Sequence, residues 1–225
     1  MATPGFEELT RRFLAFAEPY KTGEPDDRAN VRLKIDHTLR VTALAQTIAA
    51  ESALPEPAAR LSAVAALFHD TGRFPQYARW RTFQDAKSAD HARLSLEALA
   101  RGPLLDGLPR RERGVVLAAV RLHNRRALPS NLRPPLDHVA RVVRDADKLD
   151  IMAVLLAHLD ADAPRNNVVL LGLASDPARW TPACLDALAR RRNVDYASMR
   201  YTNDFRLLMA SWIYDLGYPA SARLM

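Results

Sequence analysis

Apolar residues recur along most of this 225-residue chain with the period of about 3.6 residues that marks an α-helix. One helical face is formed by His37, Val41, Leu44, Ala45 and Ile48, and the next segment repeats the pattern with Leu61, Val64, Ala65 and Phe68. Runs of alternating apolar and polar residues, which are typical of β-strands, are scarce. The pattern therefore predicts an all-α fold.

Four segments rich in proline or glycine interrupt this pattern, at 53–57, 101–109, 127–135 and 175–182. Between them we expect helices at about 5–17, 28–52, 56–70, 89–101, 110–123, 135–160, 180–192 and 199–215, and a loop at 71–88. The chain has no internal repeat, no low-complexity tract and no linker long enough to separate two domains. We therefore expect a single domain spanning residues 1–225.

The composition is that of a globular protein. Hydrophobic residues make up 48% of the chain and charged residues 26%, which is too apolar for a disordered chain. The first residues contain no apolar run of the length that a signal peptide needs, and no segment approaches the ~20 apolar residues of a membrane span. Cys184 is the sole cysteine, which excludes an intrachain disulfide and a thiolate metal cluster. We expect a cytoplasmic protein without a membrane partner; the sequence does not indicate its oligomeric state.

The chain is basic, with a formal net charge of +6 and an isoelectric point near 9.8. Its arginines are spread over many expected helices, with short clusters at 110–111, 125–126 and 190–192. No aromatic residues alternate with them, as a base-stacking surface requires. The pattern disfavours a nucleic-acid partner, whereas a small substrate that carries phosphate would also be attracted by this charge.

Histidines are distributed over the expected helices in a way that suggests a common site. Four of the six lie within different helices or at helix ends: His37, His69, His91 and His123. Asp147 begins an apolar helical face that continues to Leu155. A carboxylate aimed at a core is costly unless it is paired or binds a metal. A single histidine is more often a hydrogen-bonded core residue than a ligand, so the interpretation depends on the joint pattern.

The adjacent residues His69 and Asp70 favour a centre with two metals. Neighbouring side chains on a helix diverge by about 100 degrees, so the helix must end at this pair if both are to bind, and we expect Gly72 to supply that end. An aspartate can bridge two cations with its two oxygens. Four imidazoles and two carboxylates favour Fe, Mn, Co, Ni or Zn over Mg or Ca, so we expect two divalent transition metal ions.

The strings "IDHTLRV", "FHDTGRF", "SADHARLS", "RLHN" and "RDADKLD" follow one another in an order that resembles the HD-domain superfamily of metal-dependent phosphohydrolases, in its binuclear variety. The resemblance covers about Asp36 to Asp160. It implies a single helical bundle with a metal-binding core at about 28–160 and a C-terminal helical extension at 161–225. It also implies one metal held by His37, His69, Asp70 and Asp147, and a second held by His91, His123 and the bridging Asp70.

Further residues near these motifs are candidates for contact with a substrate. Arg73 is placed where relatives often carry Lys or Arg, and either it binds a phosphoryl oxygen or it is a solvated loop arginine. Lys148 either meets the substrate or pairs with Asp145 or Asp150. Arg40 is expected to orient a carboxylate ligand or the phosphate. The aromatic residues Tyr77, Trp80 and Phe83 are expected to line the site or to anchor their loop, and the residues expected to be structural are His138, His158 and a buried Cys184.

The resemblance implies hydrolysis of a small-molecule phosphate mono- or diester, nucleotide-like or a small phosphorylated metabolite, by a metal-activated water. The catalytic residues would be Asp70, Arg73 and Lys148. In agreement, the sequence has neither a phosphate-binding Gly-Lys-Ser/Thr loop nor a Gly-x-Ser-x-Gly elbow. Two alternatives stay open: a di-iron oxygenase related to this superfamily, and a metal-bound sensor without turnover. The "GYP" at 217–219 lies far from the metal motif and is interpreted as a coincidence.

Overall fold

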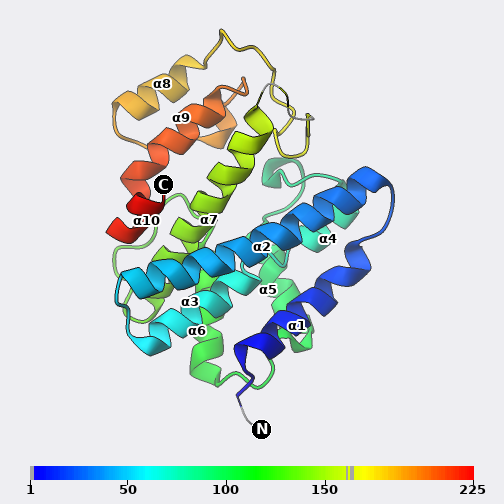
Figure 1. Cartoon of the computed structure of the whole chain (residues 1–225), viewed down its shortest axis with the longest axis vertical. Coiled ribbons are helices and arrows are strands. Elements are labelled where there is room, and N and C mark those ends of the chain that lie inside the picture. Colours follow the sequence, from blue (N-terminus) through cyan, green and yellow to red (C-terminus); the bar gives the residue numbers. More distant parts are fainter. Residues whose placement is uncertain (1–2, 161, 163–164) are drawn as a thin grey trace.

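A computed structural model describes residues 3–160, 162 and 165–225, and about two thirds of the chain is helical (Figure 1). The α-helices are α1 (Phe6–Ala17), α2 (Pro25–Glu51), α3 (Glu56–Phe68), α4 (Arg73–Trp80), α5 (His91–Arg101), α6 (Arg110–Leu122), α7 (Leu136–Leu159), α8 (Pro182–Ala189), α9 (Asp204–Ser211) and α10 (Pro219–Leu224). Short 3-10 helices are η1 (Glu18–Tyr20), η2 (Asp85–Lys87), η3 (Pro103–Leu105), η4 (Tyr196–Ser198) and η5 (Trp212–Asp215). Among the described residues, β pairing is limited to one bridge between Ala174 and Tyr201. The all-α prediction is confirmed.

The prediction of a loop at 71–88 is wrong, because this segment contains α4 and η2. Pro75 lies in the first turn of α4, where a backbone N–H has no acceptor within the helix and a proline is tolerated. Helix α4 is short, and it is followed by Arg81, whose φ of 52° is left-handed. Its length of 8 residues is too small for a clear periodic pattern.

The expected helices of the C-terminal part are only partly correct. The helix expected at 180–192 is shorter, and the one expected at 199–215 begins at Asp204 and passes into η5. Helix α10 was not expected at all. Pro219 occupies its first turn, where a proline favours the start of a helix.

The main hydrophobic core lies between α2, α3 and α7, and α1 packs against it (Figure 1). Phe13 of α1, Phe68 of α3 and Phe74 of α4 are among its fully buried side chains. Each buried aromatic side chain of this kind contributes roughly 1.5–3 kcal/mol by leaving water. The core therefore fixes the relative positions of the helices that carry the candidate metal ligands.

A second hydrophobic cluster joins the C-terminal extension to the last turns of α7. It contains Leu155 of α7 together with Phe205 and Leu208 of α9. Helix α7 thus contributes to both cores, and the single-domain organisation stays a prediction. None of the described helices has the length and apolar character needed to cross a membrane.

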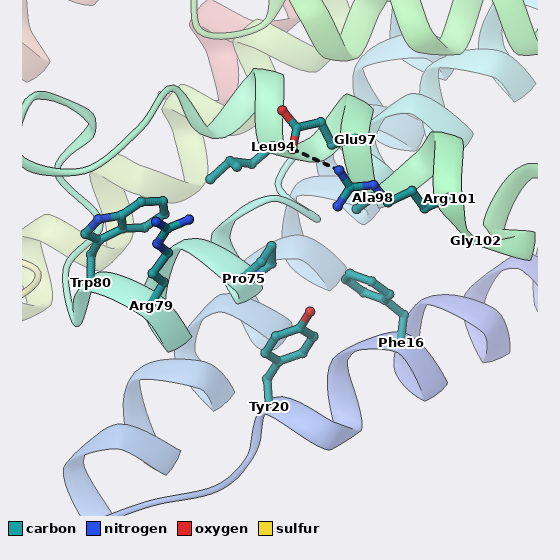
Figure 2. A pocket seen from close by; sticks show the side chains of 10 residues that line it. All are labelled: Phe16, Tyr20, Pro75, Arg79, Trp80, Leu94, Glu97, Ala98, Arg101 and Gly102. Atoms are coloured by element: carbon teal, nitrogen blue, oxygen red, sulfur yellow. Dashed lines mark ion pairs between the residues drawn. The ribbon is translucent and has the colours of Figure 1, made fainter.

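A surface groove of about 380 Å³ lies between α1, α4 and α5, away from the candidate ligands (Figure 2). Trp80 lines this groove, and the Arg79 guanidinium carbon lies 4.6 Å from the centre of its indole ring. Trp80 therefore does not fit the expectation that it lines the metal site. The groove contains none of the six candidate ligands.

Candidate metal centre

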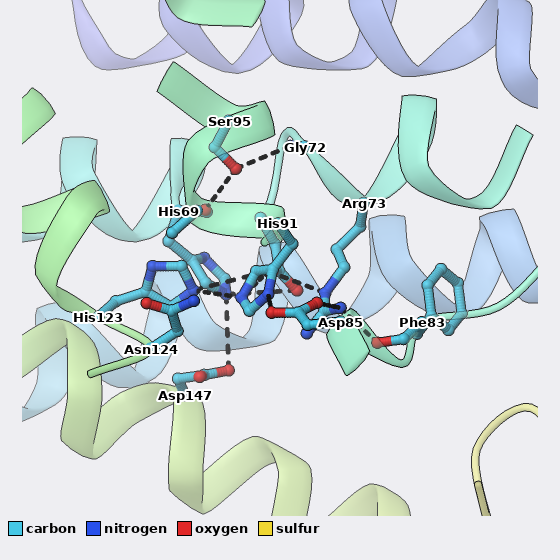
Figure 3. Close-up of polar contacts among 12 residues, drawn as sticks. His69, Gly72, Arg73, Phe83, Asp85, His91, Ser95, His123, Asn124 and Asp147 are labelled. Carbon is cyan, nitrogen blue, oxygen red and sulfur yellow. Dashed lines mark hydrogen bonds and ion pairs between the residues drawn. The ribbon is translucent and has the colours of Figure 1, made fainter. Parts of the chain in front are cut away.

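The six residues predicted to bind metal are brought together by five helices. His37 comes from the middle of α2 and Asp147 from the middle of α7; His69 and His123 directly follow the last residues of α3 and α6, and His91 is the first residue of α5. Asp70 follows His69. All except Asp147 are buried. Figure 3 shows the imidazoles of His69, His91 and His123 meeting above Asp147.

Asp70 lies at the centre of the cluster, with one carboxylate oxygen on each side. Its Oδ2 is 3.6 Å from Nε2 of His37 and 3.7 Å from Nε2 of His69. Its Oδ1 is 3.5 Å from Nε2 of His91 and 3.7 Å from Nε2 of His123. The two oxygens therefore face two different pairs of imidazoles, as a bridging ligand requires.

Asp147 completes the first of these two groups. Its Oδ1 lies 3.2 Å from Nε2 of His37 and 3.5 Å from Nε2 of His69. On the other side, the Nε2 atoms of His91 and His123 are 2.9 Å apart. Ligand atoms within 4.8 Å of one another form the overlapping groups His37–His69–Asp70, His69–His123–Asp147 and Asp70–His91–His123.

The four imidazoles present Nε2 inward because their Nδ1 atoms are used elsewhere. Nδ1 of His69 lies 2.6 Å from the carbonyl oxygen of Ala66, and Nδ1 of His123 lies 2.6 Å from that of Val120. A carbonyl only accepts, so in both rings Nδ1 carries the proton and Nε2 keeps its lone pair. This tautomer is the one that binds a metal through Nε2.

The other two rings are held by carboxylates that the sequence analysis missed. Nδ1 of His37 lies 2.7 Å from Oδ2 of Asp150, and Nδ1 of His91 lies 2.6 Å from Oδ2 of Asp85. Asp150 also accepts from Arg40, so this arginine orients the carboxylate behind His37 rather than a ligand. Asp150 lies three residues after Asp147 on the same helix, but this spacing alone does not indicate a contact with His37 of α2.

Two buried nitrogen atoms show that this arrangement fits a bound cation. Nε2 of His37 and Nε2 of His69 are buried and make no hydrogen bond. A buried acceptor without a partner costs about 1–3 kcal/mol, whereas a divalent cation would be coordinated by both lone pairs. The His and Asp residues of the centre therefore fit a divalent transition metal.

Lys34 is a further residue of the centre that the sequence analysis missed. Its Nζ donates to Oδ2 of Asp70 at 2.9 Å and lies 5.3 Å from the ring centre of Phe83. It is three residues before His37, so both side chains lie on one face of α2. Lys34 thus places a positive charge beside the bridging carboxylate.

The electrostatics keep the carboxylates charged and one imidazole neutral. Burial raises the pKa of Asp70, but the nearby Lys34 charge and its other cationic neighbours hold it well below the usual range. Burial raises the pKa of Asp147 too, but the close imidazoles of His37 and His69 outweigh it and hold the pKa well below its usual range. Burial and the Arg73 charge lower the pKa of His91 to about 4, so this ring is neutral at pH 7.

The carboxylates behind the rings show shifts of their own. Burial raises the pKa of Asp85, but the hydrogen bond from His91 outweighs it and lowers the value to about 2. Burial and the Lys34 charge lower the pKa of His37, and the nearby carboxylates of Asp147 and Asp150 more than compensate, so the net shift is upward. The site is thus lined by stable negative charges that a cation would balance.

Gly72 has a different role from the one expected. Its φ is −68°, which any residue adopts, and α3 has already ended at Phe68. A Cβ atom at Gly72 would lie 2.2 Å from the carbonyl oxygen of His91 and 2.4 Å from the backbone nitrogen of Ser95. Gly72 donates from its N–H to Oγ of Ser95 at 2.8 Å, and this Oγ donates to the carbonyl of His69. Glycine is needed here because α5 packs directly on the turn that carries His69 and Asp70.

Arg73 is not a solvated loop residue. It begins α4, its side chain is 15% exposed, and Nη1 donates to Gln76, to the carbonyl of Phe83 and to Asp85. Its Nε lies 3.4 Å from Oδ1 of Asp70 and is buried without a hydrogen bond. Arg73 therefore lies at the centre, and its contact with a phosphoryl group stays a prediction.

Lys148 points away from the ligands, although it follows Asp147. Its Nζ donates to the carbonyl oxygen of Asp215 at 3.1 Å and forms an ion pair with the Asp215 carboxylate. The expected pairing with Asp145 or Asp150 is wrong, because Asp145 accepts from Gly217 and the segment after it, and Asp150 accepts from α2. The substrate contact of Lys148 stays a prediction without a supporting contact.

The remaining residues singled out from the sequence lie outside the ligand set. His138 contacts the Tyr218 hydroxyl at 2.9 Å, and Nδ1 of His158 lies 2.8 Å from the Val154 carbonyl. Cys184 is buried, as predicted. Tyr77 is buried and donates to Asp27, so it anchors α4 rather than lining the centre. The "GYP" segment is structural, because Asp145 accepts from the N–H groups of residues 217 and 218.

Comparison with known proteins supports the same assignment. No curated protein and no solved structure matches the chain. The HD domain family matches residues 35–152, which is more than half of the 225 residues and contains all six candidate ligands. The resemblance found in the sequence motifs is thereby confirmed, and the chain belongs to the HD domain family.

Proposed function

We propose that this protein is a metal-dependent phosphohydrolase that cleaves a small-molecule phosphate mono- or diester with a metal-activated water. Two divalent transition metal ions are held by His37, His69, Asp70 and Asp147 on one side and by Asp70, His91 and His123 on the other. The substrate is nucleotide-like or a small phosphorylated metabolite. The protein acts in the cytoplasm, without a nucleic-acid or membrane partner. The HD domain family generally contains metal-dependent hydrolases, which supports the reaction class.

The observation that carries this proposal is the position of Asp70 between two pairs of imidazoles. Oδ2 lies near Nε2 of His37 and His69, and Oδ1 lies near Nε2 of His91 and His123. When bound, two metal ions supply a water of lowered pKa and balance the charge that develops on the phosphoryl oxygens. No side-chain nucleophile is needed for this chemistry.

The protein itself contributes orientation and charge. Asp85 and Asp150 hold the rings of His91 and His37, so that each Nε2 points inward. Lys34 and Arg73 are positive groups next to Asp70, and both side chains are partly exposed, at 12% and 15%. They are suited to bind the phosphoryl oxygens of a substrate that reaches the centre from this side. Lys148 has no such position, because Asp215 holds its Nζ.

The test is a screen of phosphorylated metabolites with protein reconstituted separately with Mn and with Fe, combined with measurement of oxygen uptake. Phosphate release without oxygen uptake is the expected result. Oxygen uptake with the Fe-loaded protein would instead identify a di-iron oxygenase. Metal binding without any turnover would identify a sensor module. The Asp70→Asn variant is the matched control, because it keeps the size of the side chain and removes the bridging charge.

A further inference from the structure

Gln76 of α4 is fully buried, although its side chain ends in a polar amide. Burying an amide is costly unless its hydrogen bonds are satisfied, so the groups that satisfy it indicate what the side chain does. Its Oε1 accepts from Nη1 of Arg73 at 2.9 Å, and its Nε2 lies within 2.9 Å of three acceptors. These acceptors are Oδ1 of Asp85, Oγ of Ser88 and the carbonyl oxygen of Ala89. The amide of Gln76 therefore ties α4 to the segment that leads into α5.

The contact with Asp85 fixes the orientation of its carboxylate. Oδ1 accepts from Nε2 of Gln76 at 2.9 Å and from Nη1 of Arg73 at 3.0 Å. Oδ2 is thereby directed to Nδ1 of His91, which lies 2.6 Å away (Figure 3). Because Oδ2 accepts from Nδ1, Nε2 of His91 keeps the lone pair that faces Asp70. A change at Oδ1 of Asp85 is thus transmitted to the ring of His91.

The other two acceptors fix the backbone that precedes His91. Oγ of Ser88 accepts from Gln76 and donates to the carbonyl oxygen of Gln84 at 2.7 Å. Ala89 is two residues before His91, which is the first residue of α5. Gln76 therefore holds both the carboxylate behind the His91 ring and the backbone that carries this ring.

Tyr77, the next residue of α4, is anchored in a different place. It is 4% exposed, and its hydroxyl donates to Oδ1 of Asp27 at 3.0 Å and accepts from Nδ2 of Asn30 at 2.9 Å. Both partners lie in the first two turns of α2, and neither is a candidate metal ligand. Of these two neighbouring buried residues, Gln76 is the one that is attached to the His91 side of the centre.

We propose that Gln76 is a positioning residue of the metal centre, which holds Asp85 and the backbone before α5 so that Nε2 of His91 faces the second metal ion. The proposal rests on the two-metal centre of the proposed function and does not depend on the reaction that this centre catalyses. Loss of the Gln76 amide should weaken the second metal and leave the metal beside His37 and His69 bound.

The test measures Mn binding to the full-length protein by calorimetric titration, and electron paramagnetic resonance distinguishes a coupled pair of Mn ions from single ions. Gln76→Met removes the amide and keeps a long, unbranched side chain. Gln76→Glu keeps an acceptor for Arg73 but places an oxygen, instead of an N–H, opposite Oδ1 of Asp85. Residues that orient a metal ligand typically contribute about 10- to 100-fold to metal affinity, so the second Mn should bind at least about 10-fold more weakly in both variants. The first Mn should bind as it does to the unmodified protein.

Tyr77→Phe is the matched control, because it removes two buried hydrogen bonds from the same helix without touching Asp85 or His91. It is expected to bind both Mn ions like the unmodified protein. Asp85→Ala should weaken the second Mn as well. Combining it with Gln76→Met should cost less than the product of the two single effects, because both residues act on the same ring.

Each contrary result overturns a defined statement. If a folded Gln76 variant binds the second Mn as tightly as the unmodified protein, Gln76 does not position His91. If Tyr77→Phe weakens the second Mn as much as Gln76→Met does, the effect comes from the general stability of α4, and the proposal is equally overturned. If the effects of Gln76→Met and Asp85→Ala multiply in full, Gln76 does not act through Asp85. If the unmodified protein binds a single Mn, the two-metal centre itself fails, and the role of Gln76 fails with it.

Discussion

Two buried aspartates, one in the HD core and one in the C-terminal extension, have opposite surroundings. Asp204 of α9 accepts four hydrogen bonds from nearby groups: the N–H and Oγ1 of Thr181, and the N–H groups of Arg200 and Tyr201. Asp70 accepts none from the backbone in the contacts described above. It is surrounded by the side chains of Lys34 and Arg73 and by four imidazoles at 3.5–3.7 Å.

The difference separates a structural carboxylate from one that is available to a ligand. The four donors around Asp204 come from segments that this carboxylate ties together, so its charge is satisfied by the fold. The imidazoles around Asp70 instead leave two buried Nε2 atoms without a partner, on His37 and His69. A native structure rarely leaves such atoms unsatisfied without a reason, and a bound cation supplies one.

The largest expected effect is that of Asp70→Ala. Because Asp70 faces both pairs of imidazoles, we expect this variant to lose both metals and to show only the turnover of metal-free protein. Elemental analysis together with the phosphatase assay checks the result. Retention of two metals per chain would show that Asp70 is not the bridge. His123→Ala is the graded comparison, since it should weaken mainly the second metal.

Asp204→Ala should affect the stability of the fold rather than the metal content. Removing this carboxylate leaves up to four partly buried donors without their acceptor, so we expect the free energy of unfolding to fall by about 3 kcal/mol. The metal content of the folded variant should stay unchanged. Urea denaturation and elemental analysis on the same samples measure both quantities. A loss of metal without a loss of stability would remove the distinction between the two regions.

Arg73→Ala should reduce catalysis while both metals stay bound. A guanidinium contact to a phosphoryl oxygen is worth about 1.5–3 kcal/mol, so kcat/KM should fall by about 10- to 150-fold. Arg73→Lys keeps the charge but not the planar fork, and its loss should be smaller. Steady-state kinetics on the phosphate ester that the screen identifies measure kcat/KM of both variants. Unchanged kinetics in both variants would restrict Arg73 to its contacts with Gln76 and Asp85.

Lys148→Met should have the smallest effect on catalysis. Its Nζ is bound to Asp215, so we expect kcat/KM to change by less than about threefold, which corresponds to less than about 1 kcal/mol. The stability should decrease slightly, because Asp215 keeps Arg144 as its ion-pair partner. The kinetics of Lys148→Met and Arg73→Ala are measured side by side. A fall in kcat/KM as large as that of Arg73→Ala would show that Lys148 contacts the substrate.

The ligand set could be predicted from the sequence, whereas the residues that orient it could not. Each ligand sits within a short motif on a helix with a clear period, and the order of these motifs is distinctive. Asp150 holds the His37 ring through Nδ1, but the two residues are 113 positions apart in the sequence. Only the packing of α2 on α7 brings them together. Asp85 lies on η2, inside a segment expected to be a loop.

The fold, too, could be predicted from the sequence only in part. Long helices such as α2 and α7 were expected within a few residues of their observed ends, because their apolar faces extend over many turns. Helix α4 and the extension are made of short elements whose ends are set by proline and by tertiary contacts.

The most direct test of the binuclear centre is the anomalous diffraction of crystals loaded with Mn. We expect two peaks per chain, about 3.5–4 Å apart, on the two sides of the Asp70 carboxylate. One peak should lie beside His37, His69 and Asp147, and the other beside His91 and His123. A single peak, or two peaks that do not share Asp70, would contradict the account.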